Sequence, residues 1–213
     1  MPHTPTALRQ TSGLVAERLR VGFDGHTVLD DVDLRARPGS MTGVTGPSGT
    51  GKTTLLRVLA GLVPADSGTV RYGERDTPAP GAIGMLAQHP RLVVNPRWTL
   101  RRIVAEPAVI TGGDVDVDAI AGRVGLESSL LERFPAQVSD GQLQRACVGR
   151  LLVQAPHIVL ADEPTSMLDP VAARSVIGLL QEIVDDGAAL VLVSHHRGLV
   201  ESRCAEIVEL GSR

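Results

Sequence analysis

The sequence predicts an α/β protein built on a mainly parallel core sheet that is flanked by helices. Three observations lead to this class. The short runs 158–161 and 189–193 are wholly apolar, as expected for strands that are buried on both faces. Such runs alternate with segments of helix length, which is typical of a sheet covered on both sides. Between residues 41 and 60, an apolar strand, a glycine-rich loop and a helix follow one another.

The residues before this loop predict an N-terminal antiparallel β part. Alternating apolar and polar residues are separated by the turn-forming pairs Asp24-Gly25 and Pro38-Gly39. The predicted strands are 14–23, 27–29, 32–36 and 41–45, and the last of them leads into the loop. A helix is then expected from residue 52 to about 60, ending at Gly61.

The rest of the chain predicts further strands and an inserted helical sub-domain. Strands are expected at 69–72 and 82–87, and helical segments at 99–110, 116–124 and 139–154. A helix at 171–184, a short last helix and a strand at 205–210 complete the pattern. We therefore expect a flexible tail over residues 1–13 and one domain over residues 14–213, with the helical insertion at about 89–155.

Composition limits the classes of function. The net charge of −3 gives no electrostatic argument for nucleic acid as a partner. Cys147 and Cys204 are far apart, which favours free thiols over a disulfide or a metal site. No apolar run has the length needed to cross a bilayer, and the N-terminus lacks a signal-peptide core. A cytoplasmic protein is expected.

The loop after the 41–45 strand fits the pattern G-x-x-x-x-G-K-[ST], which binds phosphate groups through backbone N–H groups and a helix N-terminus. Lys52 is the only lysine among 21 basic residues. We expect its compact ammonium at the β- and γ-phosphates, where a planar guanidinium would be too broad. The hydroxyl of Thr53 is placed to bind Mg²⁺. The expected nucleotide-binding residues of this segment are Gly46, Pro47, Ser48, Gly49, Thr50, Gly51, Lys52, Thr53 and Thr54.

Asp162 and Glu163 form a second candidate site directly after the apolar run 158–161. They fall at the carboxyl end of a predicted parallel strand, where ligands bind. Asp162 would hold Mg²⁺, usually through water, and Glu163 would polarise an attacking water molecule. A merely solvated strand end is the alternative, and the phosphate-binding loop earlier in the chain argues against it.

The segment Ser139-Asp140-Gly141-Gln142 resembles the LSGGQ signature of ABC-type ATPases, which are P-loop NTPases. Other elements match this family in order over almost the whole chain. Phe23 lies where an aromatic ring stacks on adenine, and Gln88 where the Q-loop glutamine lies. Residues 166–169 match the D-loop, and His195 follows a strand as the switch histidine does.

This resemblance implies that two such domains pair head to tail, with ATP between the phosphate-binding loop of one and the signature of the other. The implied catalytic residues are Lys52, Gln88, Glu163 and His195. The implied Mg²⁺ ligands are Thr53, Gln88 and Asp162. The residues implied to act in trans on the partner's ATP are Ser139, Asp140, Gly141, Gln142 and Asp169. Asp140 departs from the family's glycine, which raises the hypothesis of a weakened composite site.

Two aromatic features allow other interpretations. Phe23 lies beside the Asp24-Gly25 turn, which favours stacking on a base, although simple packing is an alternative. His196 stands where the family has an acidic residue, and the pair His195-His196 could suggest a metal site. Two neighbouring histidines seldom bind one ion without further ligands.

The family resemblance implies the ATP-binding subunit of an ABC transporter, with ATP and Mg²⁺ as cofactors. Residues 95–97 and 106–107 are similar to the dipeptide, oligopeptide and nickel importer branch. The implied partners are a second ATP-binding subunit, membrane permease subunits and, indirectly, an extracytoplasmic solute-binding protein, at the inner face of the membrane. The alternatives are an ABC ATPase outside transport, for example in phosphonate processing, and a P-loop kinase of small molecules.

Overall fold

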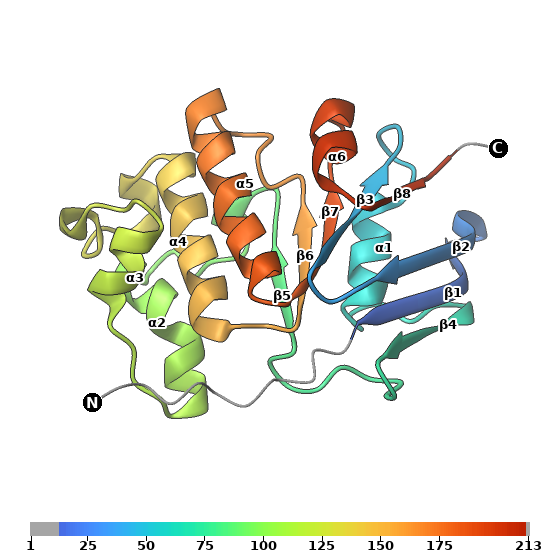
Figure 1. Cartoon of the computed structure of the whole chain (residues 1–213), viewed down its shortest axis with the longest axis horizontal. Coiled ribbons are helices and arrows are strands. Elements are labelled where there is room, and N and C mark those ends of the chain that lie inside the picture. The colour runs from blue at the N-terminus through green and yellow to red at the C-terminus, as the bar shows by residue number, and fades with distance from the viewer. Residues whose placement is uncertain (1–12, 212–213) are drawn as a thin grey trace.

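The computed structural model describes residues 13–211. The tail expected at residues 1–13 lies outside the described residues, apart from Gly13. At the centre is a five-stranded sheet in the order β5-β6-β7-β3-β8, in which every neighbouring pair is parallel (Figure 1). Its strands are β3 (Ser40–Thr45), β5 (Ile83–Leu86), β6 (Ile158–Asp162), β7 (Ala189–Val193) and β8 (Glu206–Glu209).

A second sheet of three antiparallel strands packs beside the first and has the order β2-β1-β4. Its strands are β1 (Leu14–Phe23), β2 (His26–Ala36) and β4 (Ser67–Tyr72). The prediction of two strands at 27–29 and 32–36 was wrong, because β2 is continuous. The pairing shifts by one residue between Leu19–Val32 and Val21–Leu29, and Asp31 has a φ of 55°. A β-bulge therefore bends the strand where the sequence suggested a break.

Helices lie between the strands near their predicted positions. They are α1 (Lys52–Leu59), α2 (Leu100–Thr111), α3 (Val117–Arg123), α4 (Asp140–Gln154), α5 (Pro170–Asp185) and α6 (Arg197–Arg203). Three 3-10 turns were not predicted, at Pro90–Leu92, Ser128–Leu130 and Pro135–Gln137. Between β5 and β6 the chain forms only helices, 3-10 turns and loops. The predicted fold class is confirmed, whereas the division into a domain with an inserted sub-domain stays a prediction.

The parallel sheet separates two hydrophobic cores. Val159 and Leu190 belong to the core that contains α2, α3, α4 and α5. Their strand neighbours Leu160 and Val191 belong to the other core, with α1 and the antiparallel sheet. Successive side chains of a strand point to opposite faces, so each central strand contributes to both cores. This explains why β7 is wholly apolar and why β6 is apolar up to its last residue, Asp162.

Gly43, inside β3, lets α6 approach the sheet closely. A Cβ atom at this position would lie 2.2 Å from Cγ1 of Val200 on α6 and 3.2 Å from Sγ of Cys204. Glycine inside a strand often marks such an approach. The packing of α6 against β3 fixes the path of the chain just after residue 195.

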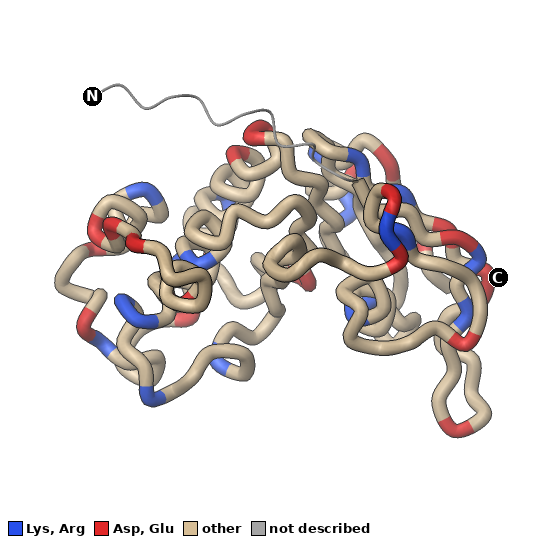
Figure 2. The backbone as a smooth tube through the Cα atoms, turned by 90° about the horizontal axis from the view of Figure 1, so that it is seen from below, with Lys and Arg blue, Asp and Glu red and all other residues tan. Residues whose placement is uncertain are grey.

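Acidic and basic residues are interspersed over the described part of the chain, as Figure 2 shows. No single-sign stretch dominates the view. None of the helices within residues 13–211 combines the length and the apolar character that a membrane span requires.

Candidate functional site

The carboxyl ends of four neighbouring parallel strands meet at one cavity of about 740 Å³. The loop after β3 carries the glycine-rich segment, Gln88 follows β5, Asp162 ends β6 and His195 follows β7. Ligands of α/β proteins bind at this edge of the sheet. The lining residues are Val28, Gly46, Pro47, Ser48, Gly49, Gly51, Lys52, Thr53, Thr54, Gln88, Asp162, Glu163 and His195.

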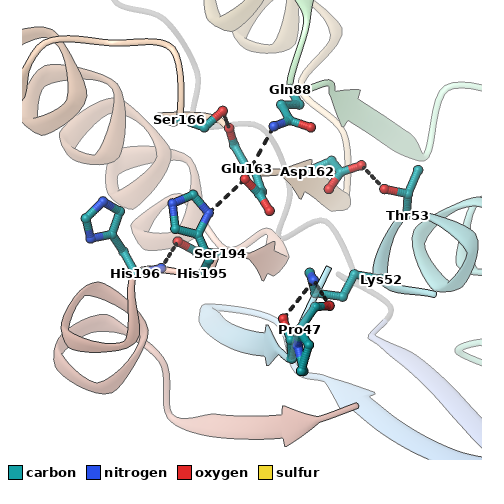
Figure 3. Close-up of polar contacts among 11 residues, drawn as sticks. Pro47, Lys52, Thr53, Gln88, Asp162, Glu163, Ser166, Ser194, His195 and His196 are labelled. Atoms are coloured by element: carbon teal, nitrogen blue, oxygen red, sulfur yellow. Dashed lines mark hydrogen bonds and ion pairs between the residues drawn. The ribbon is translucent and has the colours of Figure 1, made fainter. Parts of the chain in front are cut away.

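The ammonium of Lys52 lies against the backbone of the glycine-rich loop that precedes it. Nζ donates hydrogen bonds to the carbonyl oxygens of Gly46 at 2.8 Å and Pro47 at 2.7 Å (Figure 3). Gly51 precedes α1 with a φ of 90°, which favours glycine. A Cβ atom there would also lie 2.8 Å from Cγ1 of Val28. The loop therefore wraps tightly at the positive end of α1, a geometry suited to phosphate.

Thr53 and Asp162 form the part of the cavity that could hold Mg²⁺. The Thr53 hydroxyl donates to Oδ2 of Asp162 at 2.7 Å, joining α1 to the end of β6. A hydroxyl, a carboxylate and the amide oxygen of Gln88 are hard oxygen donors, which fit Mg²⁺. Within residues 13–211, no cluster of three or more His, Cys, Asp or Glu side chains is arranged to hold a metal ion. Bound here, Mg²⁺ would take these side-chain oxygens together with water or phosphate oxygens.

Glu163 is the centre of a polar cluster with Gln88 and His195 (Figure 3). Its Oε2 lies 2.9 Å from Nδ1 of His195 and accepts a hydrogen bond from Nε2 of Gln88 at 3.4 Å. The Glu163 side chain is 17% exposed, whereas that of His195 is 57% exposed. Three segments that are distant in the sequence thus share one carboxylate.

The backbone of Glu163 adopts a conformation that is rare for a residue other than glycine, with a φ of 43°. Its N–H donates to the carbonyl of Val193 at 3.0 Å, and its carbonyl accepts from the Ser166 hydroxyl at 3.1 Å. These two bonds fix the turn after β6. The surrounding structure therefore holds a strained residue in place, as often occurs at functional sites.

His196 contacts its sequence neighbours Ser194 and His195. Its backbone N–H donates to the Ser194 hydroxyl at 3.1 Å, and its ring stacks on that of His195 with centroids 5.1 Å apart. The stack gives the exposed His195 ring a neighbour on one side.

The residues implied to act in trans lie at the starts of α4 and α5, and none of them lines the cavity. Ser139 caps α4: its hydroxyl accepts from the N–H of Gln142 at 3.2 Å, and the Gln142 side chain accepts from the N–H of Ser139 at 2.9 Å. Asp169 caps α5, and hydrogen bonds from the N–H groups of Ala172 and Val171 hold its pKa below the usual value. Gly141 lies in the first turn of α4.

Asp140 is paired within its own chain. Its Oδ1 accepts a hydrogen bond from Nε of Arg91 at 2.7 Å. This partner could not be predicted from the sequence, because no motif covers Arg91. The negative charge that distinguishes this signature from the family pattern thus has a positive neighbour.

Two of the residues predicted to bind the chain's own nucleotide, Phe23 and Thr50, do not line the cavity. Phe23 is 49% exposed at the end of β1, so its stacking role stays a prediction. Thr50 supports the loop, because its hydroxyl donates to the carbonyl of Pro47 at 2.9 Å. Val28 lines the cavity but was not predicted, since a lone valine in a strand carries no motif.

Known proteins resemble this chain in sequence over most of its length. The sequence model of the family described as ABC transporter matches residues 29–166. The methionine import ATP-binding protein MetN of Cereibacter sphaeroides is 39% identical over 187 residues, which are 81% of this chain but only 52% of that protein. The lipoprotein-releasing system ATP-binding protein LolD of Idiomarina loihiensis is 37% identical, covering 84% of this chain and 85% of its own length.

A solved structure described as the ATP binding subunit of an ABC transporter superimposes with a TM-score of 0.82 at 25% identity. The superposition covers 92% of this chain and 85% of the other. Further relatives are named for cystine, histidine, oligopeptide and phosphonate transport. The chain thus spans most of some relatives and about half of others.

Proposed function

This chain belongs to the family of ABC transporter ATP-binding domains, and from that premise we propose that it binds Mg²⁺-ATP and hydrolyses it to power transport. The observation that carries the proposal is the cavity in which the Lys52 loop, the Thr53–Asp162 pair and the Glu163 cluster face one another. Together these groups supply phosphate binding, oxygen ligands for a divalent cation, and a carboxylate base.

Each group has a defined task in phosphoryl transfer to water. The loop N–H groups and Lys52 bind the β- and γ-phosphates and neutralise part of their charge. Thr53, Gln88 and Asp162 would hold Mg²⁺, which would supply positive charge to the phosphate oxygens. Glu163 orients the attacking water and accepts its proton as the water oxygen bonds to the γ-phosphorus and the bond from that phosphorus to the bridging oxygen of ADP breaks. His195 lies beside Glu163, would help to orient that carboxylate and would contact the γ-phosphate.

The other half of each site would come from a second ATP-binding subunit. Ser139, Gly141 and Gln142 stand at the N-terminal end of α4, where backbone N–H groups and the helix dipole favour an anion. Since these residues lie outside the cavity of their own chain, a head-to-tail pair would bring them to the partner's ATP. Closure of the pair on ATP and its reopening after hydrolysis would then drive separate membrane permease subunits, from the cytoplasmic face.

The relatives do not agree on one transported solute. The matching relatives are named for methionine, cystine, histidine and oligopeptide transport and for lipoprotein release, so no one branch is favoured. The peptide or nickel importer branch and its solute-binding protein therefore stay a prediction. An ABC ATPase outside transport is not favoured by these relatives. A small-molecule kinase would leave the Ser139–Gln142 segment and His195 without a role.

The proposal is tested by phosphate release from Mg²⁺-ATP, measured on the chain co-expressed and purified with its operon neighbours. We expect ADP and inorganic phosphate in equal amounts, and permease subunits in the purified complex. A phosphorylated small molecule in place of free phosphate would support the kinase. Hydrolysis without any co-purified membrane protein would support an ATPase outside transport.

A further inference from the structure

Arg91 connects the segment after Gln88 to the N-terminal end of α4. It lies in the 3-10 turn Pro90–Leu92. Its Nε donates to Oδ1 of Asp140 at 2.7 Å, its Nη2 donates to the carbonyl of Val138 at 2.7 Å, and its Nη1 donates to the carbonyl of Pro135. All three nitrogens of the guanidinium are thus used on one short segment. A lysine could not serve three acceptors in this fixed planar arrangement.

A second connection lies deeper, at Gln144 of α4. This side chain is 2% exposed, and its Nε2 donates to the carbonyl of Pro164 at 3.1 Å and to that of Ala87 at 3.4 Å. Ala87 directly precedes Gln88, and Pro164 directly follows Glu163. Residues 87–91 are therefore held against α4 at both ends, by Gln144 at the first residue and by Arg91 at the last.

The contact with Arg91 also places a positive charge beside Asp140. In a head-to-tail pair this residue would stand beside the partner's triphosphate, where an unpaired carboxylate would repel the γ-phosphate. The ion pair is 40% exposed on the Arg91 side and 38% on the Asp140 side, so solvent screens it and its own contribution to stability is small. Its importance therefore lies in geometry and in local charge, because it keeps a positive group next to this carboxylate.

We propose that Arg91 is a positioning residue for ATP hydrolysis: it holds the Ser139–Gln142 segment against the Gln88 loop and neutralises Asp140. Through this contact, the Gln88 loop, which faces the chain's own ATP, moves as one unit with the Ser139–Gln142 segment, which would face the partner's ATP. The inference rests on the proposed function, and it predicts that the Asp140 signature forms a working composite site in the presence of Arg91.

The test compares Arg91→Ala, Asp140→Asn and the double variant in the co-purified complex. Arg101→Ala is the matched control, because Arg101 is also 40% exposed and pairs with Asp118 and Glu132 elsewhere among the helices. Steady-state ATP hydrolysis gives kcat and KM, and binding of ATP to the isolated chain gives the affinity of its own phosphate-binding loop.

For Arg91→Ala we expect kcat to fall about tenfold, since the segment is displaced and carries a bare carboxylate. ATP affinity of the isolated chain should stay within about twofold of the unmodified value, because no cavity-lining residue is changed. The double variant should have a kcat about threefold higher than that of Arg91→Ala, because the uncompensated charge is removed. In Asp140→Asn alone, Arg91 keeps its bonds to the carbonyls of Pro135 and Val138, so this variant should be faster than Arg91→Ala.

Several outcomes would overturn the inference. One is an Arg91→Ala variant with the same kcat as Arg101→Ala. Another is a double variant that is no faster than Arg91→Ala. Should Arg91→Ala fail to fold, Arg91→Lys replaces it; this variant keeps the charge beside Asp140 but loses the fork, and kcat equal to that of the unmodified complex contradicts the inference. An unmodified complex that hydrolyses no ATP refutes the proposed function itself, and this inference with it.

Discussion

Lys52 lies with its ammonium within hydrogen-bonding distance of two carbonyl oxygens of its own loop, and it is 9% exposed. In such a confined place the shape of the cation matters as much as its charge. An ammonium donates in several directions from one point, whereas a guanidinium needs a broad planar site. This contrast explains why position 52 carries a lysine in a chain whose other Lys and Arg positions are all arginine.

Lys52→Arg should therefore bind ATP poorly although the charge is kept. Loss of well-placed hydrogen bonds to a charged group costs about 2 kcal/mol, or about 30-fold in affinity. Titration with a fluorescent ATP analogue measures the change. The control is the reverse exchange Arg101→Lys, at an exposed ion pair, which should leave the affinity unaltered. ATP binding by Lys52→Arg equal to that of the control would remove the geometric argument.

At the scale of elements, sequence patterns predicted the regular strands and helices well, because apolar runs and capping residues are local signals. Strands β1 and β7 have the predicted bounds, and α4 begins directly after its cap Ser139. The failures were local deviations. The bulge at Asp31 and the 3-10 turn Pro90–Leu92 depend on contacts with other segments, which a sequence pattern does not contain.

The capping box of α4 gives a prediction that separates stability from catalysis. Ser139→Ala should lower the free energy of unfolding by about 1 kcal/mol, because the N–H of Gln142 loses its acceptor. Ser139→Asn should keep the cap and therefore the stability. Chemical denaturation measures both variants.

If Ser139 also contacts the partner's ATP, both variants should lose ATP hydrolysis, although only one is less stable. An Asn variant with normal stability and normal hydrolysis would show that Ser139 acts only as a helix cap. Normal stability of the Ala variant would instead contradict the capping role.

At the scale of the whole molecule, the sequence predicted most of the cavity because its motifs occur at the ends of parallel strands. Gln88, Asp162 and His195 are distant in the chain, yet strands β5, β6 and β7 are neighbours in the sheet. Their meeting therefore follows from topology. Arg91 and Val28 could not be predicted in this way, since their roles depend on packing between segments without a motif. The residues at the starts of α4 and α5 depend on a partner and stay predictions.

In the proposed function, ATP hydrolysis by this chain depends on Glu163 as the catalytic carboxylate. The most direct measurement compares Mg²⁺-ATP binding and phosphate release in the unmodified complex and in Glu163→Gln. An amide can still hydrogen-bond to Gln88 and His195 but cannot act as a base. We predict unchanged ATP binding and phosphate release that is lower by about 100-fold or more. A Glu163→Gln complex that releases phosphate at the unmodified rate would show that Glu163 is not the catalytic carboxylate.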